Sequence, residues 1–152
     1  MIDLKSWPDN NAFRAAVNKT PYYKTIAIEL MKLDKRGAVA RIKSGRKHRN
    51  LWGTVHGGAL ASLVDSTSGL STVPHLKDGE TIMTVSLQVD YFAPAVKGDV
   101  IARGRMVHRS KRLARAEAII EDEQKNLIAK GHAIYMIFSV NNNDQAKARR
   151  SR

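Results

Sequence analysis

The sequence predicts an α+β fold in which a mostly antiparallel sheet packs against one central helix. Helical and strand patterns are segregated along the chain, in the order helix, two strands, central helix and four strands. Residues 81–92 alternate between apolar and polar side chains, which is typical of a strand with one buried face. Residues 57–70 combine an apolar stripe with many small side chains, so this helix can lie close to a sheet that curves around it.

The N-terminal third predicts a short helix followed by a β-hairpin. A helical pattern covers residues 9–19, with Asp9 or Asn10 as its N-cap. Two strand-like segments then flank a turn at residues 34–37, and the glycine that ends this turn can supply a left-handed backbone conformation. A basic loop, residues 44–49, leads to the central helix.

Four strands are expected after the central helix. The apolar face predicted for the first of them consists of Met83, Val85, Leu87, Val89 and Tyr91. Pro94 and Gly98 interrupt the pattern, and three more strands are expected over residues 99–108, 112–121 and 127–139. The turn before the last strand lacks a glycine, so we expect Asn126 to take the left-handed position there.

Composition narrows the class of protein. The 152 residues fit one domain, and 43% hydrophobic residues suffice for a packed interior. Without cysteine there is no disulfide and no thiolate metal site, and His48, His75, His108 and His132 show no ligand spacing, so we expect neither a metal nor a cofactor. The start of the sequence lacks a signal-peptide pattern, and no apolar run approaches the roughly 18 residues of a membrane span. These features favour a cytoplasmic protein.

The formal net charge of +12 is concentrated in three basic clusters, within residues 41–49, 103–115 and 147–152. Such an excess favours an anionic partner: a nucleic acid, an acidic membrane or a phosphate-bearing small molecule. The alternative is a solvated basic surface. Only 6% of the residues are aromatic, and there is no helix-turn-helix signal and no RNA-binding sheet motif, so a nucleic-acid partner is disfavoured.

The predicted central helix begins with an unusual motif, "GTVHGG" at residues 53–58. Gly57 and Gly58 each cost about 1 kcal/mol of helix propensity relative to alanine. A helix N-terminus offers free N–H groups and a partial positive charge to an oxyanion, and glycine lets a carbonyl approach closely. Asp65 can then serve as nucleophile or general base. The alternatives are close packing for the glycines, a structural role for His56 and a surface position for Asp65.

The spacing of these groups constrains any shared site. Gly57 and Asp65 are eight residues apart, or about 12 Å along a helix, so one carbonyl carbon cannot lie within about 3 Å of both. Two antiparallel central helices related by a two-fold axis could place Asp65 of one chain opposite Gly57 of the other. A site built from both groups therefore requires at least a homodimer.

These motifs resemble the hotdog-fold acyl-CoA thioesterases of the PaaI-like group, which includes thioesterase superfamily member 2. The resemblance covers residues 22–139. It rests on His56-Gly57-Gly58 with Asp65 nine residues after the histidine, on Asn50 ahead of them, and on the segments "TVSLQVDYFAPAVKGD" and "LIAKGHAIYMIF". It implies a hotdog fold, in which an antiparallel sheet wraps a central helix, and dimers that commonly pair into homotetramers. The implied activity is hydrolysis of acyl-CoA.

The resemblance also implies roles for individual residues. The backbone N–H of Gly57 would polarise the thioester carbonyl, and Asp65 would act as nucleophile or as general base on water. Asn50 and His56 would help to hold the thioester, and Thr84 would position the water or the acid. The residues expected at the substrate pocket are Gly58, Val64, Ser68 and Met83, together with Trp52.

Coenzyme A carries a 3′-phosphate and a pyrophosphate, which gives the basic clusters a candidate role. The turn "HRSKR" lies where this family often places CoA-contacting residues, so Arg109, Lys111 and Arg112 are the first candidates. The second candidates, in the basic loop, are Arg46, Lys47 and Arg49. The acyl group is left open among aromatic, medium-chain and long-chain thioesters, and so is a choice between CoA and an acyl carrier protein.

The expected organisation is an N-terminal helical segment at residues 1–21, a hotdog thioesterase domain at 22–140 and a basic, disordered tail at 141–152. The main alternative to an enzyme is a non-catalytic acyl-CoA-binding or regulatory hotdog domain. Asp65 argues against that alternative, because a binding domain needs no carboxylate there. A hotdog dehydratase is also possible, but its usual histidine and acid arrangement is absent from this sequence.

Overall fold

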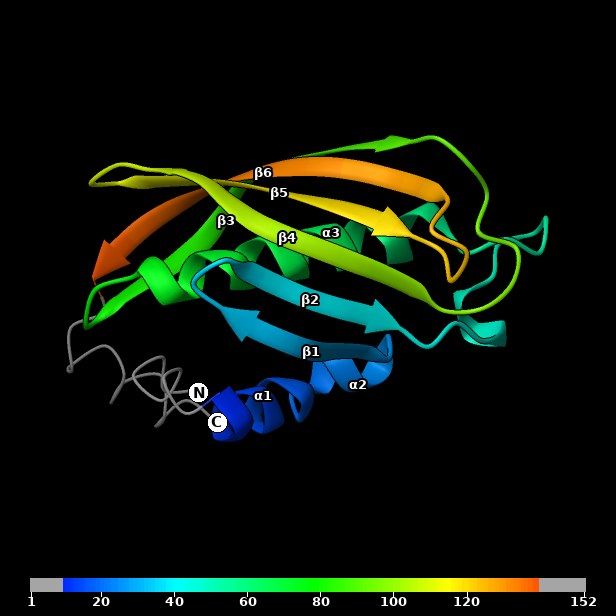
Figure 1. The fold of residues 1–152 in the computed structure, drawn as a ribbon, viewed down its shortest axis with the longest axis horizontal. Helices are drawn as coiled ribbons and strands as arrows, with labels where there is room; N and C mark the ends of the chain where they lie inside the picture. The colour runs from blue at the N-terminus through cyan, green and yellow to red at the C-terminus, as the bar shows by residue number, and fades with distance from the viewer. Residues whose placement is uncertain (1–9, 140–152) are drawn as a thin grey trace.

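A computed structural model describes residues 10–139, which form one curved antiparallel sheet around a central helix (Figure 1). The helices are α1 (Asn10–Asn18), α2 (Pro21–Thr25) and α3 (Gly57–Thr72), with 3-10 turns η2 (Arg46–His48) and η3 (Val73–His75). The strands are β1 (Ile28–Asp34), β2 (Gly37–Ile42), β3 (Glu80–Tyr91), β4 (Val100–Arg109), β5 (Leu113–Glu121) and β6 (Leu127–Ser139).

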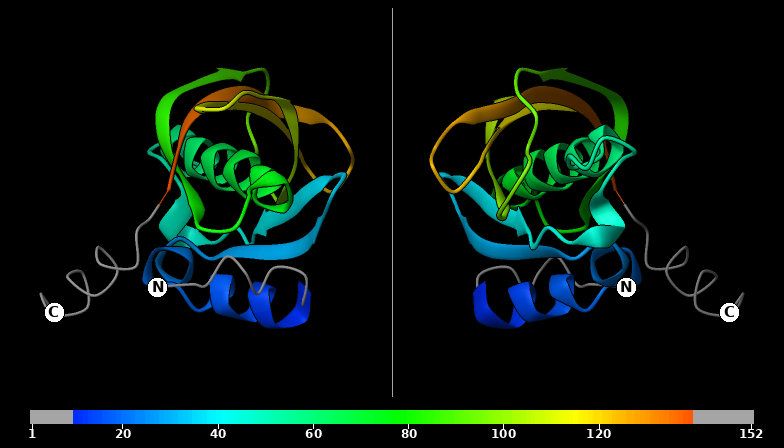
Figure 2. Two further views of the ribbon diagram at one scale, coloured as in Figure 1. Left: turned by 90° about the vertical axis from the view of Figure 1, so that its left-hand side faces the viewer. Right: turned by 90° about the vertical axis from the view of Figure 1, so that its right-hand side faces the viewer.

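The six strands lie in the order β1-β2-β4-β5-β6-β3, and every neighbouring pair is antiparallel. Figure 2 shows α3 enclosed by the curvature of the sheet, with α1 and α2 beside β1. The predicted α+β fold, a sheet wrapped around one helix, is confirmed. Helix α2 was not predicted, although Pro21 at its start is a helix-initiation signal. The predicted tail, residues 141–152, lies outside the described residues.

The face of the sheet toward α3 is called the inner face here, and the opposite face the outer face. Leu60, Leu63 and Val64 of α3 are buried against the inner face. Two strand glycines allow the close approach: a Cβ on Gly104 would lie 2.6 Å from the Thr67 carbonyl oxygen, and one on Gly131 would lie 2.7 Å from Val64 Cγ1. Tight helix–sheet packing therefore depends on glycines of β4 and β6.

Strand β3 carries a β-bulge between Thr84 and Ser86. Residues paired across an antiparallel ladder share a face of the sheet. Thr84 pairs with the buried Tyr135 and so lies on the inner face, whereas Met83 pairs with the exposed Met136 and lies on the outer face. The extra residue of the bulge reverses the alternation along β3.

The predicted single apolar face of β3 is therefore wrong. Met83 occupies the outer face, and past the bulge the inner-face residues are Leu87, Val89 and Tyr91, whose partners Ala133, Gly131 and Ala129 are buried. The prediction of a buried face also fails for the single chain, because Val85 is 58% exposed and Tyr91 is 52% exposed. Apolar side chains along β3 are thus open to solvent.

The two hairpin turns differ in how well the sequence anticipated them. Gly37 takes a positive φ of +146°, as the turn at residues 34–37 predicted. In the turn before β6 the positive φ falls on Lys125, at +68°, and the prediction for Asn126 is wrong. The cause is Asp122, whose carboxylate accepts hydrogen bonds from the backbone amides of Gln124 and Asn126, each at 2.9 Å, and thereby shapes the turn.

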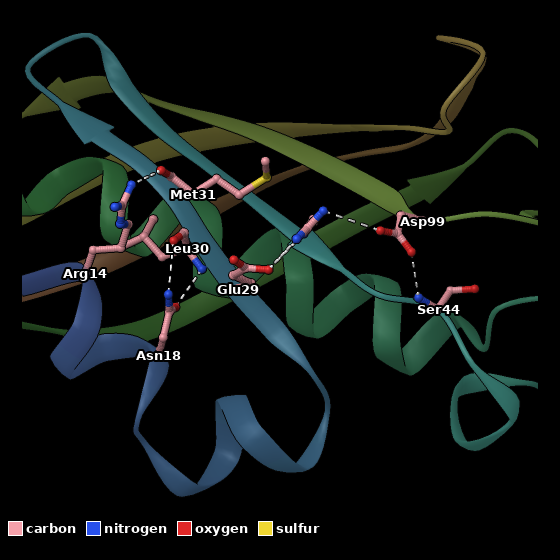
Figure 3. Close-up of polar contacts among 8 residues, drawn as sticks. Arg14, Asn18, Glu29, Leu30, Met31, Ser44 and Asp99 are labelled. Atoms are coloured by element: carbon pink, nitrogen blue, oxygen red, sulfur yellow. Dashed lines mark hydrogen bonds and ion pairs between the residues drawn. The ribbon is translucent and has the colours of Figure 1, made fainter. Parts of the chain in front are cut away.

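The two edge strands of the sheet differ in whether another element satisfies their backbone groups. At the β1 edge, Asn18 of α1 accepts a hydrogen bond from the Leu30 amide at 2.7 Å and donates one to the Leu30 carbonyl at 3.2 Å (Figure 3). Arg14 donates to the Met31 carbonyl at 2.8 Å. Helix α1 therefore satisfies backbone groups that an edge strand would leave open. Strand β3 forms the other edge and, among the described strands, pairs only with β6.

Candidate active site

The start of α3 presents one free backbone amide. His56 is the N-cap, and its ring Nδ1 accepts a hydrogen bond from the Gly58 amide at 2.9 Å. The amides of Ala59 and Leu60 both donate to the His56 carbonyl oxygen. Within residues 10–139 the half-buried Gly57 amide has no hydrogen-bond partner, so it can donate to an external acceptor at the positive end of the helix.

Packing does not account for the two glycines at this helix start. A Cβ on Gly57 would meet the Tyr91 ring at 3.5 Å, an ordinary van der Waals distance. A Cβ on Gly58 would meet only the ring of His56, with its Nδ1 at 3.0 Å. Unlike a Cβ on Gly104 or Gly131, which would meet backbone atoms under 3 Å away, a Cβ on either of these residues would meet a single side chain. Their helix-propensity cost therefore has no compensation from tight packing against the sheet.

The loop before α3 is held rigidly by Asn50 and Arg49. The Asn50 side-chain oxygen accepts hydrogen bonds from the amides of Trp52 and Thr54, and its Nδ2 donates to Thr54 Oγ1 at 2.8 Å. Arg49 donates to the carbonyl oxygens of Gly53, Ala95 and Val96 and to Ser44 Oγ. The structure thus places Asn50 in the loop that orients the helix start, and it leaves Trp52 83% exposed on this loop.

Asp65 is half-buried in the middle of α3, and one of its carboxylate oxygens is held in place. Oδ1 accepts a hydrogen bond from Thr84 Oγ1 at 3.0 Å and a longer one from the Tyr135 hydroxyl at 3.3 Å. Oδ2 has no hydrogen-bond or ion-pair partner in the described part of the chain. The structure therefore brings the predicted pair Asp65 and Thr84 together and leaves one carboxylate oxygen available.

Tyr135 was not anticipated from the sequence. It lies in β6 on the inner face, 2% exposed, and its hydroxyl also lies 3.0 Å from the Asp65 carbonyl oxygen. Burial raises the pKa of the Tyr135 phenol above its usual value, and the neighbouring Asp65 carboxylate raises it further; the same two causes raise the pKa of Tyr23. The available signal was a hydroxyl-bearing residue among the otherwise apolar inward positions of β6.

Three of the predicted pocket residues do not face the accessible side of Asp65. Val64 and Ser68 are fully buried, and Ser68 Oγ bonds the Val64 carbonyl oxygen and the Tyr135 hydroxyl, each at 2.7 Å. Met83 lies on the outer face because of the bulge in β3. Gly58, by contrast, is exposed beside the helix start.

Of the three side chains predicted first as CoA contacts, one is engaged in an ion pair within the protein and two are exposed. Arg109 forms an ion pair with Glu80, and its Nε is buried without a hydrogen-bond partner among the described residues. Lys111 and Arg112 are exposed at the turn between β4 and β5.

Among the second candidates for the CoA contacts, in the basic loop, two side chains are engaged within the protein and one is exposed. Arg49 is committed to the loop before α3, and Lys47 donates to the Thr25 carbonyl oxygen at 2.7 Å. Arg46 is exposed.

One hollow of the molecule lies away from Asp65. A cavity of about 300 Å³ opens on the outer face between the β1–β2 hairpin and strands β4 and β5, and its lining includes Arg36, Arg103 and Glu117. Helix α3 and Asp65 lie on the other side of the sheet. In residues 10–139, no helix is long and apolar enough to cross a membrane.

Comparison with known proteins agrees with this architecture. A family model described as "Domain of unknown function (DUF4442)" matches residues 9–137. The chain belongs to this family. Among relatives of this DUF4442 protein, acyl-coenzyme A thioesterase 13 of Mus musculus is 30% identical, over 61% of the chain and 67% of that protein. The medium/long-chain acyl-CoA thioesterase YigI of Escherichia coli K12 is 26% identical, over 77% of the chain and 85% of the relative.

The solved structures extend the comparison to the fold. A mutant of the phenylacetic acid degradation protein PaaI from Thermus thermophilus matches with a TM-score of 0.70 and 27% identity, covering 77% of this chain and 98% of that one. The DUF4442 chain is therefore a member of the hotdog-fold thioesterase superfamily, in the PaaI-like group. The family resemblance seen in the sequence is confirmed.

Proposed function

We propose that this protein hydrolyses acyl-CoA thioesters to a free acid and CoA. The observation that carries the proposal is Asp65, a half-buried carboxylate with one oxygen held by Thr84 and the other without a partner in the described chain. The free Gly57 amide at the start of the same helix adds an oxyanion donor. The names of the mouse and E. coli relatives support acyl-CoA as the substrate class.

The reaction needs two functions from these groups. The Gly57 N–H donates to the thioester carbonyl oxygen and stabilises the negative charge that develops on it. The Asp65 carboxylate either attacks the carbonyl carbon, giving an acyl-enzyme anhydride that water then hydrolyses, or removes a proton from the water that attacks. In both routes the carbon–sulfur bond breaks and the CoA thiolate takes up a proton. Both routes give the same products.

The proposed site is shared between two chains. Helix α3 is continuous from Gly57 to Thr72, so Gly57 and Asp65 of one chain stay about 12 Å apart along it. The open β3 edge, with exposed Val85 and Tyr91, supports a homodimer that joins the sheets of two chains there. We extend the proposal to pairs of such dimers, as homotetramers, because the family resemblance implies them.

The proposal is tested by free-thiol release from short, medium, long-chain and aromatic acyl-CoAs, with wild type and Asp65→Asn. We expect turnover of at least one ester by the wild type and a loss of about 10³-fold or more in Asp65→Asn, because the amide can neither attack nor accept the proton. Matched unfolding curves and oligomeric states would confirm that the variant is folded. A wild type that binds acyl-CoA without releasing thiol would instead favour a non-catalytic binding domain.

A further inference from the structure

We infer that Tyr135 is a positioning residue that, together with Thr84, fixes Oδ1 of Asp65 and leaves Oδ2 as the reacting oxygen. This inference rests on the proposed function. Thr84 reaches Oδ1 from β3 and Tyr135 reaches it from β6, so donors on two different strands converge on one oxygen. In the described chain nothing bonds Oδ2. The two carboxylate oxygens are thus in different environments.

The ring and the hydroxyl of Tyr135 are both fixed by contacts with α3. Its ring packs on α3 where a Cβ on Gly69 would lie 3.4 Å from the ring and hydroxyl atoms, so the small residue at this position makes room for it. Its hydroxyl lies 2.7 Å from Ser68 Oγ and 3.0 Å from the Asp65 carbonyl oxygen. Tyr135 therefore contacts both the backbone and the side chain of Asp65 from a fixed place in the core.

The direction of the hydrogen bond follows from the partners. Burial raises the pKa of Tyr135, so the phenol keeps its proton and can donate. Ser68 Oγ lies 2.7 Å from the Val64 carbonyl oxygen and can donate its own proton there. The ionised carboxylate is the strongest acceptor within reach of the phenol proton, because charge-assisted hydrogen bonds are roughly twice as strong as neutral ones. Donation toward Asp65 is therefore the favoured arrangement.

Two donors on Oδ1 limit rotation of the carboxylate about its Cβ–Cγ bond. With Oδ1 anchored, Oδ2 keeps one orientation relative to α3 and to the substrate of the shared site. A misplacement of about 1 Å in a reacting group can cost about 100-fold in rate. Tyr135 thus acts through Asp65 and need not touch the substrate.

The test compares Tyr135→Phe with Tyr22→Phe. Tyr22 serves as the control because its hydroxyl also lies 2.7 Å from a serine of α3, Ser62 Oγ, but makes no hydrogen bond with Asp65 in the described chain. With the ester that the wild type hydrolyses best, we expect Tyr135→Phe to lower kcat about 10-fold with KM within about twofold, since one donor to a charged group is lost. Tyr22→Phe should leave both constants unchanged.

A second pair of variants covers the case in which Tyr135→Phe does not fold. Thr84 is exposed on β3, so Thr84→Val removes the other donor to Oδ1 without a change in the core, and Thr84→Ser keeps it. We expect kcat to fall about 10-fold in Thr84→Val and to stay near wild type in Thr84→Ser. If Tyr135→Phe folds, an unchanged kcat in this variant contradicts the inference. If Tyr135→Phe does not fold, equal kcat values in the two Thr84 variants contradict it. Either result leaves the proposed function standing. A wild type without turnover overturns the proposed function, and this inference with it.

Discussion

At the scale of single residues, the glycines of this protein are present for two different reasons, packing in the strands and chemistry at the start of α3. Gly104 and Gly131 are required by packing, since a Cβ on either would lie under 3 Å from neighbouring atoms. A Cβ on Gly57 would lie at an ordinary 3.5 Å from the Tyr91 ring, and one on Gly58 would meet only the His56 ring, at 3.0 Å. The Gly57 amide has no partner in residues 10–139. A backbone donor without a partner at a helix N-terminus is what an oxyanion site requires.

Replacement of Gly57 by proline tests that donor directly. Gly57 is the first residue of α3, where proline is tolerated, and His56 before it has φ −61° and ψ 135°, a conformation compatible with a following proline. We expect Gly57→Pro to lower kcat about 10²–10³-fold, because the N–H is lost. Gly57→Ala keeps the N–H, and its Cβ would lie at an ordinary 3.5 Å from the Tyr91 ring, so it should lose less activity than Gly57→Pro. Equal activity of the two variants in thiol-release assays would contradict the role of the amide.

The sequence predicted some of these residues and not others for a physical reason. Gly57 and Asp65 belong to one helix, so their spacing is local information. The Thr84 contact with Asp65 was anticipated only through the family resemblance. Tyr135 lies 70 positions from Asp65 and reaches it through strand order and register, which no local pattern encodes.

At the scale of elements, the sequence predicted where the strands lie but not the bulge that sets which side chains of β3 face α3. The segments of the four later strands follow from apolar patterning and from their turns. The bulge in β3 could not be predicted, because an uninterrupted alternation over residues 81–92 is the pattern of a regular strand. It decides which residues share a face with Asp65, since without it Met83 and Tyr91 would lie on the same side.

The start of β3 and the end of β4 are joined by a largely buried ion pair between Glu80 and Arg109. Burial alone would raise the pKa of Glu80, but hydrogen bonds from the Lys77 amide and from Arg109 outweigh it, so the pKa lies below its usual value of 4.5. A lowered pKa in the folded state means that Glu80 stabilises the fold above its unfolded-state pKa and loses this contribution as the pH falls through the folded-state value.

Glu80→Gln should therefore destabilise the protein at neutral pH and not in acid. We expect a loss of about 1–2 kcal/mol in the free energy of unfolding at pH 7, since hydrogen bonds to a charged group are weakened. The difference from wild type should shrink as the pH falls below 4.5, where the native carboxyl becomes protonated. Urea unfolding at a series of pH values measures this, and a difference that grows toward acid would contradict it.

At the scale of the whole molecule, one edge strand of the sheet is covered by a helix and the other is open. Helix α1 supplies hydrogen bonds to β1, while β3 is 12 residues long and exposes Val85, Leu87 and Tyr91. Long apolar edge strands are sites where a second chain adds to a sheet. The open edge belongs to the strand that supplies Thr84 to Asp65, so a dimer formed there would place its interface beside the proposed site.

The most direct test of the shared site is to combine two inactive variants, Asp65→Asn and Gly57→Pro, in one preparation. Chains that associate at random form mixed dimers in half of the cases, and each mixed dimer has one site with both Gly57 and Asp65 intact. For a shared site, we expect recovery of about a quarter of the wild-type activity per chain. Activity no higher than the mean of the two separate variants, with mixed dimers present by mass spectrometry, would contradict a site shared between chains.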